Sequence, residues 1–310
     1  MDLDKIFSLK NITDSSKQLY IRNLTKLNDG KEIKNLRFLN DEQSILGKLE
    51  KYKPNTQRSF IISIVSLLKC MTISDSKKWK KLYDKYYIIL DTLNKELKSN
   101  TEKTPKEEEN WLTKEQIEAK LDEYKPIMAI AKKKKKLDEA EYKRLLHFLI
   151  LALYTLQPPR RNADYQNSLI AKKFNRDLLN DNNVVDMEND NFLFSKYKTA
   201  GTYNIQEQPM SSDIQDILKM YIKHHPKKSE FTNKTPIPFL VDYLGNELKN
   251  NNDITRILYR VFDGKKIGSS MLRKMFLTAK YGDTLEELKI DTEAMGTSTG
   301  TAADHYIKED

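Results

Sequence analysis

Two arginine-bearing segments and a late tyrosine carry the residue types that metal-free phosphodiester cleavage requires. The first segment, residues 156–165, contains Arg161, and the second, residues 270–277, places Arg273 in an apolar helical run; Tyr306 follows. In the transition state of cleavage, negative charge collects on the non-bridging oxygens of the phosphate. A guanidinium is always charged and donates two parallel hydrogen bonds. Arg161 and Arg273 are therefore the predicted clamp for that phosphate, acting by electrostatic preorganisation.

The order and spacing of these residues resemble the tyrosine recombinases, the phage-type integrases. The first family box, Arg-x-x-Glu/Asp, is matched by residues 161–164, and the second, His-x-x-Arg, by residues 270–273 with Ser270 in the histidine position. The third is Leu/Met-Gly-His followed by the nucleophilic tyrosine; here residues 295–297 read Met-Gly-Thr, and Tyr306 stands nine residues after Thr297. The Pro-Pro-x-Arg-Asn form of the first box looks like integrases carried by viruses and mobile elements of eukaryotic hosts.

The resemblance implies a site-specific DNA recombinase that cleaves and rejoins strands through a 3′-phosphotyrosyl intermediate on Tyr306. Because an unperturbed tyrosine has a pKa near 10, neighbouring arginines would be needed to favour the phenolate. The implied partners are double-stranded DNA and further copies of the chain, as a dimer or tetramer on DNA. The implied location is intracellular, in the host cytoplasm (a viral factory) or the nucleus.

A proton donor for the leaving 5′-oxygen is the next requirement, and relatives supply it from a lysine on a β-hairpin. The matching segment, residues 192–199, contains Lys196 and Lys198. Residues two apart lie on the same face of a strand, so both are candidates. Lys198 is preferred because it adjoins a predicted hairpin turn at residues 200–201. Lys196 stays open as the alternative.

Several polar residues around the boxes receive provisional roles. Arg160 is the alternative to Arg161, but the Arg-x-x-Asp spacing favours Arg161, with Asp164 holding its guanidinium side-on. Ser270 and Thr297 can donate hydrogen bonds to phosphate oxygens where relatives use histidine, and Lys274 adds positive charge.

There is one cysteine and no His-x-x-x-His pair, so neither a metal site nor a cofactor is predicted.

Charge and length bound the broad class. The 310 residues carry a net charge of +9 with a pI near 9.1, which favours a polyanionic partner, nucleic acid first. The biased codons of an AT-rich genome account for part of this basicity. The single cysteine fits a reducing compartment. Residues 1–9 lack the apolar core of a signal peptide, and no apolar run approaches the roughly 18 residues that span a membrane.

The predicted fold is mostly α with a small antiparallel sheet, in two domains. Residues 1–105 form a helical core-binding, DNA-clamping domain of four amphipathic helices, and residues 106–310 form a mixed α+β catalytic domain of the tyrosine-recombinase kind. A polar stretch at residues 99–110 is predicted to be the linker. The residues predicted to contact DNA are the basic ones on the helical faces and beside the boxes: Arg58, Lys77, Lys78, Lys80, Lys81, Arg160, Lys196 and Lys274.

Within the catalytic domain, the helices expected are residues 138–155, 212–224, 253–262 and 270–281, and the strands are residues 167–171, 184–187, 192–194 and 203–206. The run of five lysines at residues 132–136 is interpreted as a solvated helix end in preference to a nuclear-localisation or phosphate-binding patch.

Two rival functions remain beside the recombinase. One is a non-catalytic DNA-binding relative, which the absent histidines favour. The other is a type IB topoisomerase-like enzyme, which uses the same tyrosine chemistry on one strand. Sequence-specific synapsis of two DNA sites would distinguish the recombinase from the topoisomerase. Relaxation of supercoiled DNA by monomers would favour the topoisomerase.

Overall fold

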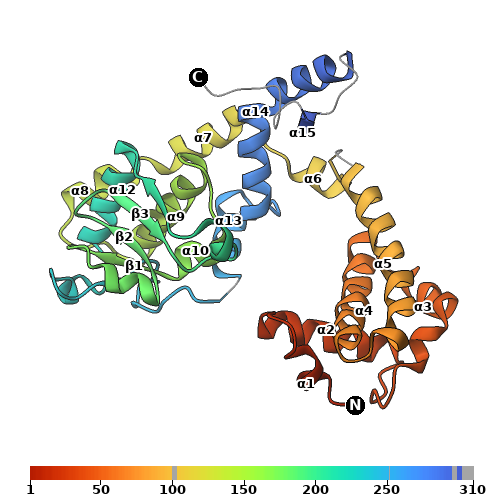
Figure 1. Ribbon diagram of the computed structural model, residues 1–310. Helices are drawn as coiled ribbons and strands as arrows, with labels where there is room; N and C mark the ends of the chain where they lie inside the picture. The colour runs from red at the N-terminus through yellow and green to blue at the C-terminus, as the bar shows by residue number, and fades with distance from the viewer. Residues whose placement is uncertain (100–102, 251, 295–298, 302–310) are drawn as a thin grey trace. The chain divides into compact units, whose positions relative to one another are not determined.

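The computed structural model describes residues 1–99, 103–250, 252–294 and 299–301 (Figure 1). The chain divides into two compact units, the first running from Met1 to Glu102 and the second starting at Lys103. The fold is mostly helical with one small sheet, and the sheet belongs to the second unit.

The first unit is a bundle built around the helical pair α4 and α5. Its helices are α1 (Leu3–Phe7), α2 (Asp14–Leu27), the 3-10 turn η1 (Arg37–Asn40), α3 (Glu42–Leu49), α4 (Pro54–Ser74) and α5 (Ser76–Ser99). Pro54 occupies the first turn of α4, where its missing N–H costs nothing. Ile61, Ile64 and Leu68 of α4 are fully buried in the core. The four amphipathic helices expected in this region are confirmed as α2, α3, α4 and α5.

The second unit is organised around one buried helix, α9 (Glu139–Thr155). Residues 148–154 of α9 are all buried, and a helix that is apolar on every side belongs in a protein interior. It packs against α7, α8, α12, α13 and α14. The other helices of the unit are α6 (Pro105–Asn110), α7 (Lys114–Tyr124), α8 (Ile127–Lys133), α10 (Asn162–Gln166), η2 (Arg176–Asn180), α11 (Ala200–Tyr203), α12 (Ser212–Lys223), η3 (Lys228–Glu230), α13 (Asp253–Val261), α14 (Ser269–Ala294) and α15 (Thr299–Thr301).

The sheet has five strands in the order β4-β3-β2-β1-β5. They are β1 (Ser168–Ala171), β2 (Asn183–Asp186), β3 (Asn191–Phe194), β4 (Gln206–Pro209) and β5 (Ile237–Pro238). The expectation of a purely antiparallel sheet is wrong, because β1 and β2 pair in parallel, with Leu169 opposite Val184. The segment between them, which includes η2, is long enough to return the chain in the same direction.

The strand expected at residues 203–206 is displaced. Residues 200–203 form the short helix α11, and β4 begins only at Gln206. The helix ends at Asn204, whose N–H donates to the Ala200 carbonyl at 2.8 Å and whose φ is positive. The chain changes direction at Asn204, and this change moves the start of the strand to Gln206. The residue types alone do not predict it.

The expected linker at residues 99–110 is partly wrong, because its second half is helix α6. Thr104 and Glu107 form a reciprocal capping box at the start of α6. Asn110 at its end is buried, and its side-chain oxygen accepts from the Lys266 N–H at 2.7 Å. A polar segment is therefore held to the second unit by caps and hydrogen bonds rather than by apolar packing.

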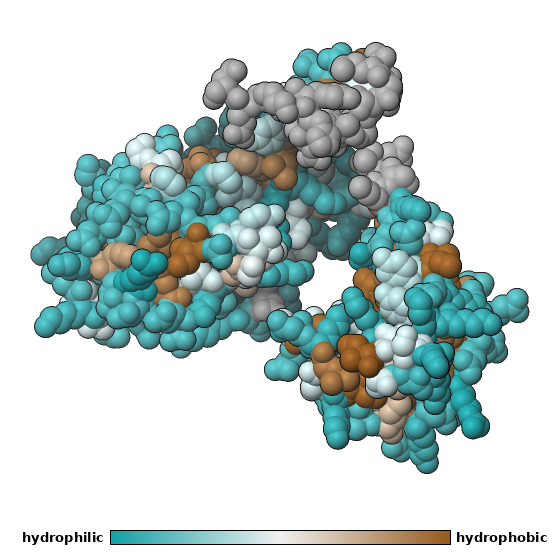
Figure 2. Space-filling view, in the orientation of Figure 1, coloured by the Kyte–Doolittle hydropathy of each residue, from teal (hydrophilic) through white to brown (hydrophobic). Residues whose placement is uncertain are grey.

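On the face that Figure 2 shows, each unit is largely hydrophilic and carries some hydrophobic patches. The lysine run at residues 132–136 lies exposed at the end of α8, as the solvated helix-end interpretation predicts. Within the described ranges, no helix combines the length and the apolar character needed to cross a bilayer.

Candidate active site

Three arginines from two distant segments line one pocket in the second unit. Arg160 and Arg161 come from the turn after α9, and Arg273 comes from the start of α14. The pocket has a volume of about 430 Å³. The other residues that line it are Pro158, Pro159, Asp164, Tyr197, Thr199, Tyr203, Gln206 and Gln208. The structure thus brings together both arginines that were predicted to clamp a phosphate.

Local sequence explains how the two segments reach the pocket. The consecutive prolines at residues 158–159 end the helical path of α9 and turn the chain, because proline removes a helical hydrogen bond and clashes with the preceding turn. Arg161 then stands at the N-cap of α10 in extended backbone, and its side chain makes no capping bond. On α14, Leu272 and Met275 are buried in the core and fix the first turns of the helix, which leaves Arg273 half-buried beside them.

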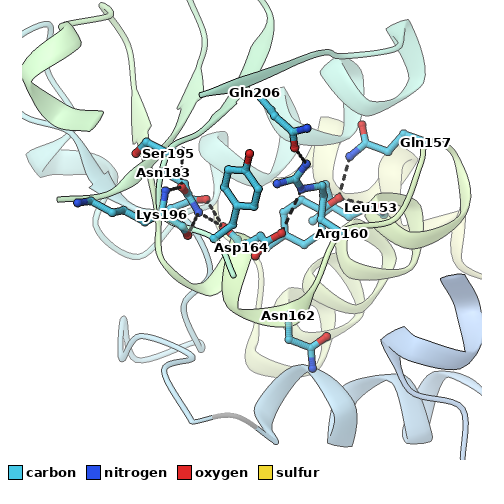
Figure 3. Close-up of polar contacts among 12 residues, drawn as sticks. Leu153, Gln157, Arg160, Asn162, Asp164, Asn183, Ser195, Lys196 and Gln206 are labelled. Atoms are coloured by element: carbon cyan, nitrogen blue, oxygen red, sulfur yellow. Dashed lines mark hydrogen bonds and ion pairs between the residues drawn. The ribbon is translucent and has the colours of Figure 1, made fainter. Parts of the chain in front are cut away.

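Arg160 is fully engaged by the protein (Figure 3). Its Nε donates to Oδ2 of Asp164 at 3.1 Å, and its Nη1 donates to Oε1 of Gln206 at 2.5 Å. The guanidinium carbon lies 4.1 Å from the Phe194 ring centre and 4.7 Å from that of Tyr197, so Arg160 makes cation–π contacts with both rings. These contacts give Arg160 an architectural part in the pocket wall.

The prediction that Asp164 holds Arg161 side-on is wrong, because Asp164 holds Arg160 instead. Arg160 and Arg161 both precede α10, which begins at Asn162, so the turn after α9 places their side chains, and it brings Arg160 to Asp164. Only 2% of Asp164 is exposed. Burial raises the pKa of this carboxyl, and the adjacent Arg160 opposes that rise.

Arg161 and Arg273, by contrast, keep their guanidinium groups available. Neither side chain forms a hydrogen bond or an ion pair with any residue in the described part of the chain. The Arg273 charge acts on the buried Tyr154 hydroxyl, whose pKa is raised by burial and drawn down somewhat by this arginine. Two permanent charges with free donors in one concavity form a site for an anion that has several acceptor oxygens.

The two candidate proton donors do not lie on a strand, contrary to the expectation. Strand β3 ends at Phe194, and both Lys196 and Lys198 are exposed in the loop that follows it. Neither lysine lines the pocket, although Tyr197 and Thr199 on either side of Lys198 do. Figure 3 shows the Lys196 side chain extending away from Arg160. Lys198 therefore lies between two residues of the pocket lining, and its own exposed side chain is not part of that lining.

The remaining predicted residues of the site are spread around it or lie outside the described residues. Ser270 is exposed on the first turn of α14, one turn before Arg273, and is not among the residues that line the pocket. Lys274 is exposed and forms an ion pair with Glu107 of α6. The hydrogen bond from Lys274, followed by that from the Thr104 N–H, lowers the pKa of Glu107 to about 2. The predicted residues Thr297 and Tyr306 lie outside the described residues.

The predicted DNA contacts of the first unit separate into two kinds. The four lysines Lys77, Lys78, Lys80 and Lys81 are exposed on the first turns of α5. Lys78 lies 5.0 Å from the Trp79 ring centre and Lys80 pairs with Asp84 at 3.2 Å, while Lys77 and Lys81 have no partner among the described residues. Arg58 differs, because it is half-buried and donates to Asn94 at 2.5 Å, which ties α4 to α5.

The sequence did not predict the far wall of the pocket, which is formed by Tyr197, Tyr203, Gln206 and Gln208. One signal was available: Gln206 and Gln208 alternate with exposed residues along β4, so both face the same side. The folding of residues 200–203 into a helix had no such signal, and it is this helix that brings Tyr203 to the rim.

No family model, no curated protein and no solved structure matches this chain. Among the residues that the structure describes, no group of three or more His, Cys, Asp or Glu side chains could hold a metal ion. The arginines, tyrosines and amides that line the pocket can bind a phosphate and stabilise charge that develops on its oxygens.

Proposed function

We propose that this chain is a DNA strand-exchange enzyme of the tyrosine-recombinase type. One observation carries the proposal: Arg161 and Arg273, far apart in sequence, line one pocket and neither has a protein partner among the described residues. A DNA phosphodiester presents two non-bridging oxygens, which is what two unpaired guanidinium groups in a concavity can bind.

The proposed reaction begins with the scissile phosphate between Arg161 and Arg273. The phenolate oxygen of Tyr306 attacks phosphorus, a phosphorus–oxygen bond to tyrosine forms, and the bond from phosphorus to the 5′-oxygen breaks. Lys198, or Lys196 in its place, gives the leaving 5′-oxygen its proton. The arginines act mainly in the transition state, where the charge on the non-bridging oxygens is largest. Attack by a 5′-hydroxyl on the phosphotyrosyl bond then rejoins a strand without ATP.

Binding to the DNA duplex would come from a different set of residues. The unpaired Lys77 and Lys81 on α5 carry exposed charges suited to backbone phosphates, which every DNA sequence offers alike. The net charge of +9 acts in the same direction. The proposal thus divides the work between lysines that give affinity and arginines that act on one phosphate.

A non-catalytic DNA-binding protein is the second candidate, and Ser270 favours it. This residue stands where relatives carry a histidine, yet it is exposed and does not line the arginine pocket. Such a protein would hold the phosphate in the same pocket and leave it intact. The two candidates therefore agree on binding and differ only in whether a covalent bond forms.

Covalent trapping decides between them. Duplexes selected by the protein from a random pool are rebuilt with a nick next to each candidate position, so that cleavage releases a short fragment and strands the enzyme on the DNA. The wild-type chain is expected to give a band on a denaturing gel that persists in EDTA. Tyr306→Phe should bind the duplex equally and give no band, and Tyr281→Phe, an exposed tyrosine on α14, should behave as wild type.

Two outcomes would change the proposal. If the wild-type chain binds its selected duplex and gives no adduct, the non-catalytic candidate takes its place. If magnesium is required for cleavage and no protein–DNA bond forms, the pocket belongs to a nuclease mechanism instead.

A further inference from the structure

The loop at residues 195–205, between β3 and β4, forms one rim of the arginine pocket. Thr199 and Tyr203 of this loop line the pocket. Tyr203 is 61% exposed, and its side chain forms no hydrogen bond or ring contact with any described residue. The pocket lining thus includes an exposed aromatic ring as well as two unpaired guanidinium groups, and this ring is available to contact a ligand.

The loop is anchored at its start by a buried amide. The Asn183 side-chain oxygen accepts from the backbone N–H groups of Ser195 at 2.9 Å and of Lys196 at 2.7 Å. The Asn183 amide nitrogen donates to the Asp164 carbonyl at 2.8 Å and to the Lys196 carbonyl at 3.1 Å (Figure 3). The start of the loop is therefore tied to α10, the helix that follows Arg161.

Arg160 anchors the rest of the loop. The Tyr197 ring lies on its guanidinium, and the Tyr197 hydroxyl donates to the Asn204 carbonyl at 2.6 Å across the loop. At the far end, Gln206 accepts from the same guanidinium. The contacts at the start, middle and end of the loop all lead back to the wall of the pocket, so the rim is set before any ligand arrives.

Asn204 is strained, with φ 56° and ψ −154°, a region of backbone space that only glycine enters freely. Its neighbours on both sides are exposed apolar side chains, Tyr203 at 61% and Ile205 at 44%. Two hydrogen bonds hold Asn204 in this strained conformation: its N–H donates to Ala200, and its carbonyl accepts from Tyr197. The strain costs free energy, and the conformation leaves the two neighbouring apolar side chains exposed to solvent. Strain of this kind gathers at sites that contact ligands.

We propose that Tyr203, assisted by Ile205, is a further DNA-contacting residue, whose ring packs against the sugar and base next to the phosphate held by Arg161 and Arg273. The inference rests on the proposed function, because it takes DNA as the occupant of the pocket. Charge favours DNA over a protein partner: Lys196 and Lys198 are exposed in the same loop, and Asp164, the carboxylate among the described residues of the lining, is paired with Arg160. Apolar and aromatic side chains of this kind pack on bases and sugars without reading sequence.

The first test measures the affinity for a fluorescein-labelled duplex, selected from a random pool, by fluorescence anisotropy. Tyr203→Ala is expected to weaken binding by roughly tenfold or more, as for the loss of one base-stacking aromatic. Tyr203→Phe keeps the ring and should restore wild-type affinity. Leu244→Ala is the matched control, since Leu244 is an exposed apolar residue of the same unit that does not line the pocket, and its affinity should not change.

A second test follows the loop itself. In Tyr203→Trp, the new indole should lose emission when duplex is added, beyond any change that Trp79 and Trp111 show in the unmodified chain. Glycine can adopt the backbone conformation of Asn204 without strain. Asn204→Gly should therefore raise the melting temperature and leave DNA affinity near wild type.

The outcomes separate the two proposals. If Tyr203→Ala binds duplex as tightly as the wild type while Arg273→Ala binds less tightly or cleaves more slowly, the loop inference is overturned and the proposed function stands. If Tyr203→Ala instead changes the oligomeric state without DNA and leaves DNA affinity alone, the ring belongs to an interface between copies, which also overturns it. If the wild-type chain shows no affinity for DNA, the proposed function fails first.

Discussion

The lysine face of α5 and the arginine pocket of the second unit are both positive, but they are built differently. Lys77 and Lys81 are exposed and lack partners among the described residues, so their long side chains move freely in solvent. Arg161 and Arg273 are half-buried on backbone that prolines, a helix cap and buried neighbours hold in place. Mobile surface charge contributes affinity for any polyanion, whereas fixed charge can match the geometry of one phosphate. The comparison predicts that rate and affinity can be altered separately.

The two units also differ in their titrating groups. All four histidines of the chain belong to the second unit, and the first has none. Each unit has one of the two tryptophans, Trp79 in the first and Trp111 in the second. The pocket therefore sits in the unit that acid should weaken, and each unit carries its own fluorescent reporter.

The largest expected effect is on the cleavage rate. Arg161→Ala and Arg273→Ala should each slow single-turnover cleavage of a nicked duplex by about 10²–10³-fold, the usual cost of removing one donor to a developing oxyanion. Affinity for the duplex should fall far less, because many other phosphate contacts remain. Loss of affinity without loss of rate at saturating DNA would assign these arginines to binding alone. Arg273→Lys, which keeps the charge and loses the fork, should lie between the alanine variant and wild type.

Acid should destabilise the second unit before the first. Burial lowers the pKa of both His147 and His225 to about 4, below the unfolded value near 6.5. The neutral forms therefore stabilise the fold fully above pH 6.5, and this contribution is lost as the pH falls from 6.5 towards 4, up to about 3 kcal/mol per histidine. In His225, a proton on Nδ1 would face the Lys227 N–H that now donates to it.

Urea unfolding at pH 7 and pH 5 measures this difference. With Trp79→Phe, emission from Trp111 reports the second unit, and its midpoint should move to lower urea at pH 5. With Trp111→Phe, emission from Trp79 reports the first unit, and its midpoint should stay nearly constant. Equal shifts for the two reporters would show that the histidines do not set the acid stability.

The lysine face should affect affinity and leave the rate unchanged. Lys77→Gln with Lys81→Gln should weaken binding to all duplexes alike and reduce the slope of log affinity against log salt by about 2. Cleavage at saturating DNA should be unaffected. The double arginine variant of the same positions keeps both charges and serves as the control. An unchanged salt slope for the glutamine variant would remove this face from the interface.

The smallest effect is expected at Lys274, which differs from the α5 lysines because it already has a partner in Glu107. Glu107→Gln keeps the capping box of α6, since glutamine serves at this position, and releases the ammonium group. The affinity for duplex should then rise by less than about fivefold, in line with the small worth of exposed ion pairs, and only at low salt. A fall in affinity would mean that the ion pair supports the DNA-binding form.

Much of the helical framework could be predicted because it depends on long, regular patterns. The stripe of α4 and the apolar run of α9 extend over several turns, and β1, β2 and β3 stand out as short apolar runs between Asn and Asp turns. Pairing direction is not encoded in this way, so the parallel β1–β2 pair was missed. Helix α6 was missed because its caps, rather than an apolar stripe, hold it.

The arginines of the site could be predicted from the sequence, but which of them pairs with Asp164 could not. The boxes identified Arg161 and Arg273, and the fold places both in one pocket. Which arginine pairs with Asp164 depends on the geometry of the turn that leads into α10, and the residue types do not fix that geometry, so the assignment to Arg161 was wrong. The rim formed by Tyr203 depends on a backbone reversal at Asn204 that residue types do not signal.

Chemical protection of the arginines tests the central claim, that Arg161 and Arg273 bind a DNA phosphate, most directly. The full-length chain is treated with an arginine-selective dicarbonyl reagent, with and without its selected duplex, and modification is located by mass spectrometry. In the free protein, Arg161 and Arg273 should react, while Arg160 should react slowly because Asp164, Gln206 and two rings enclose it. With DNA bound, Arg161 and Arg273 should both become protected and Arg160 should not change. Equal modification of Arg161 and Arg273 with and without saturating duplex would contradict the claim.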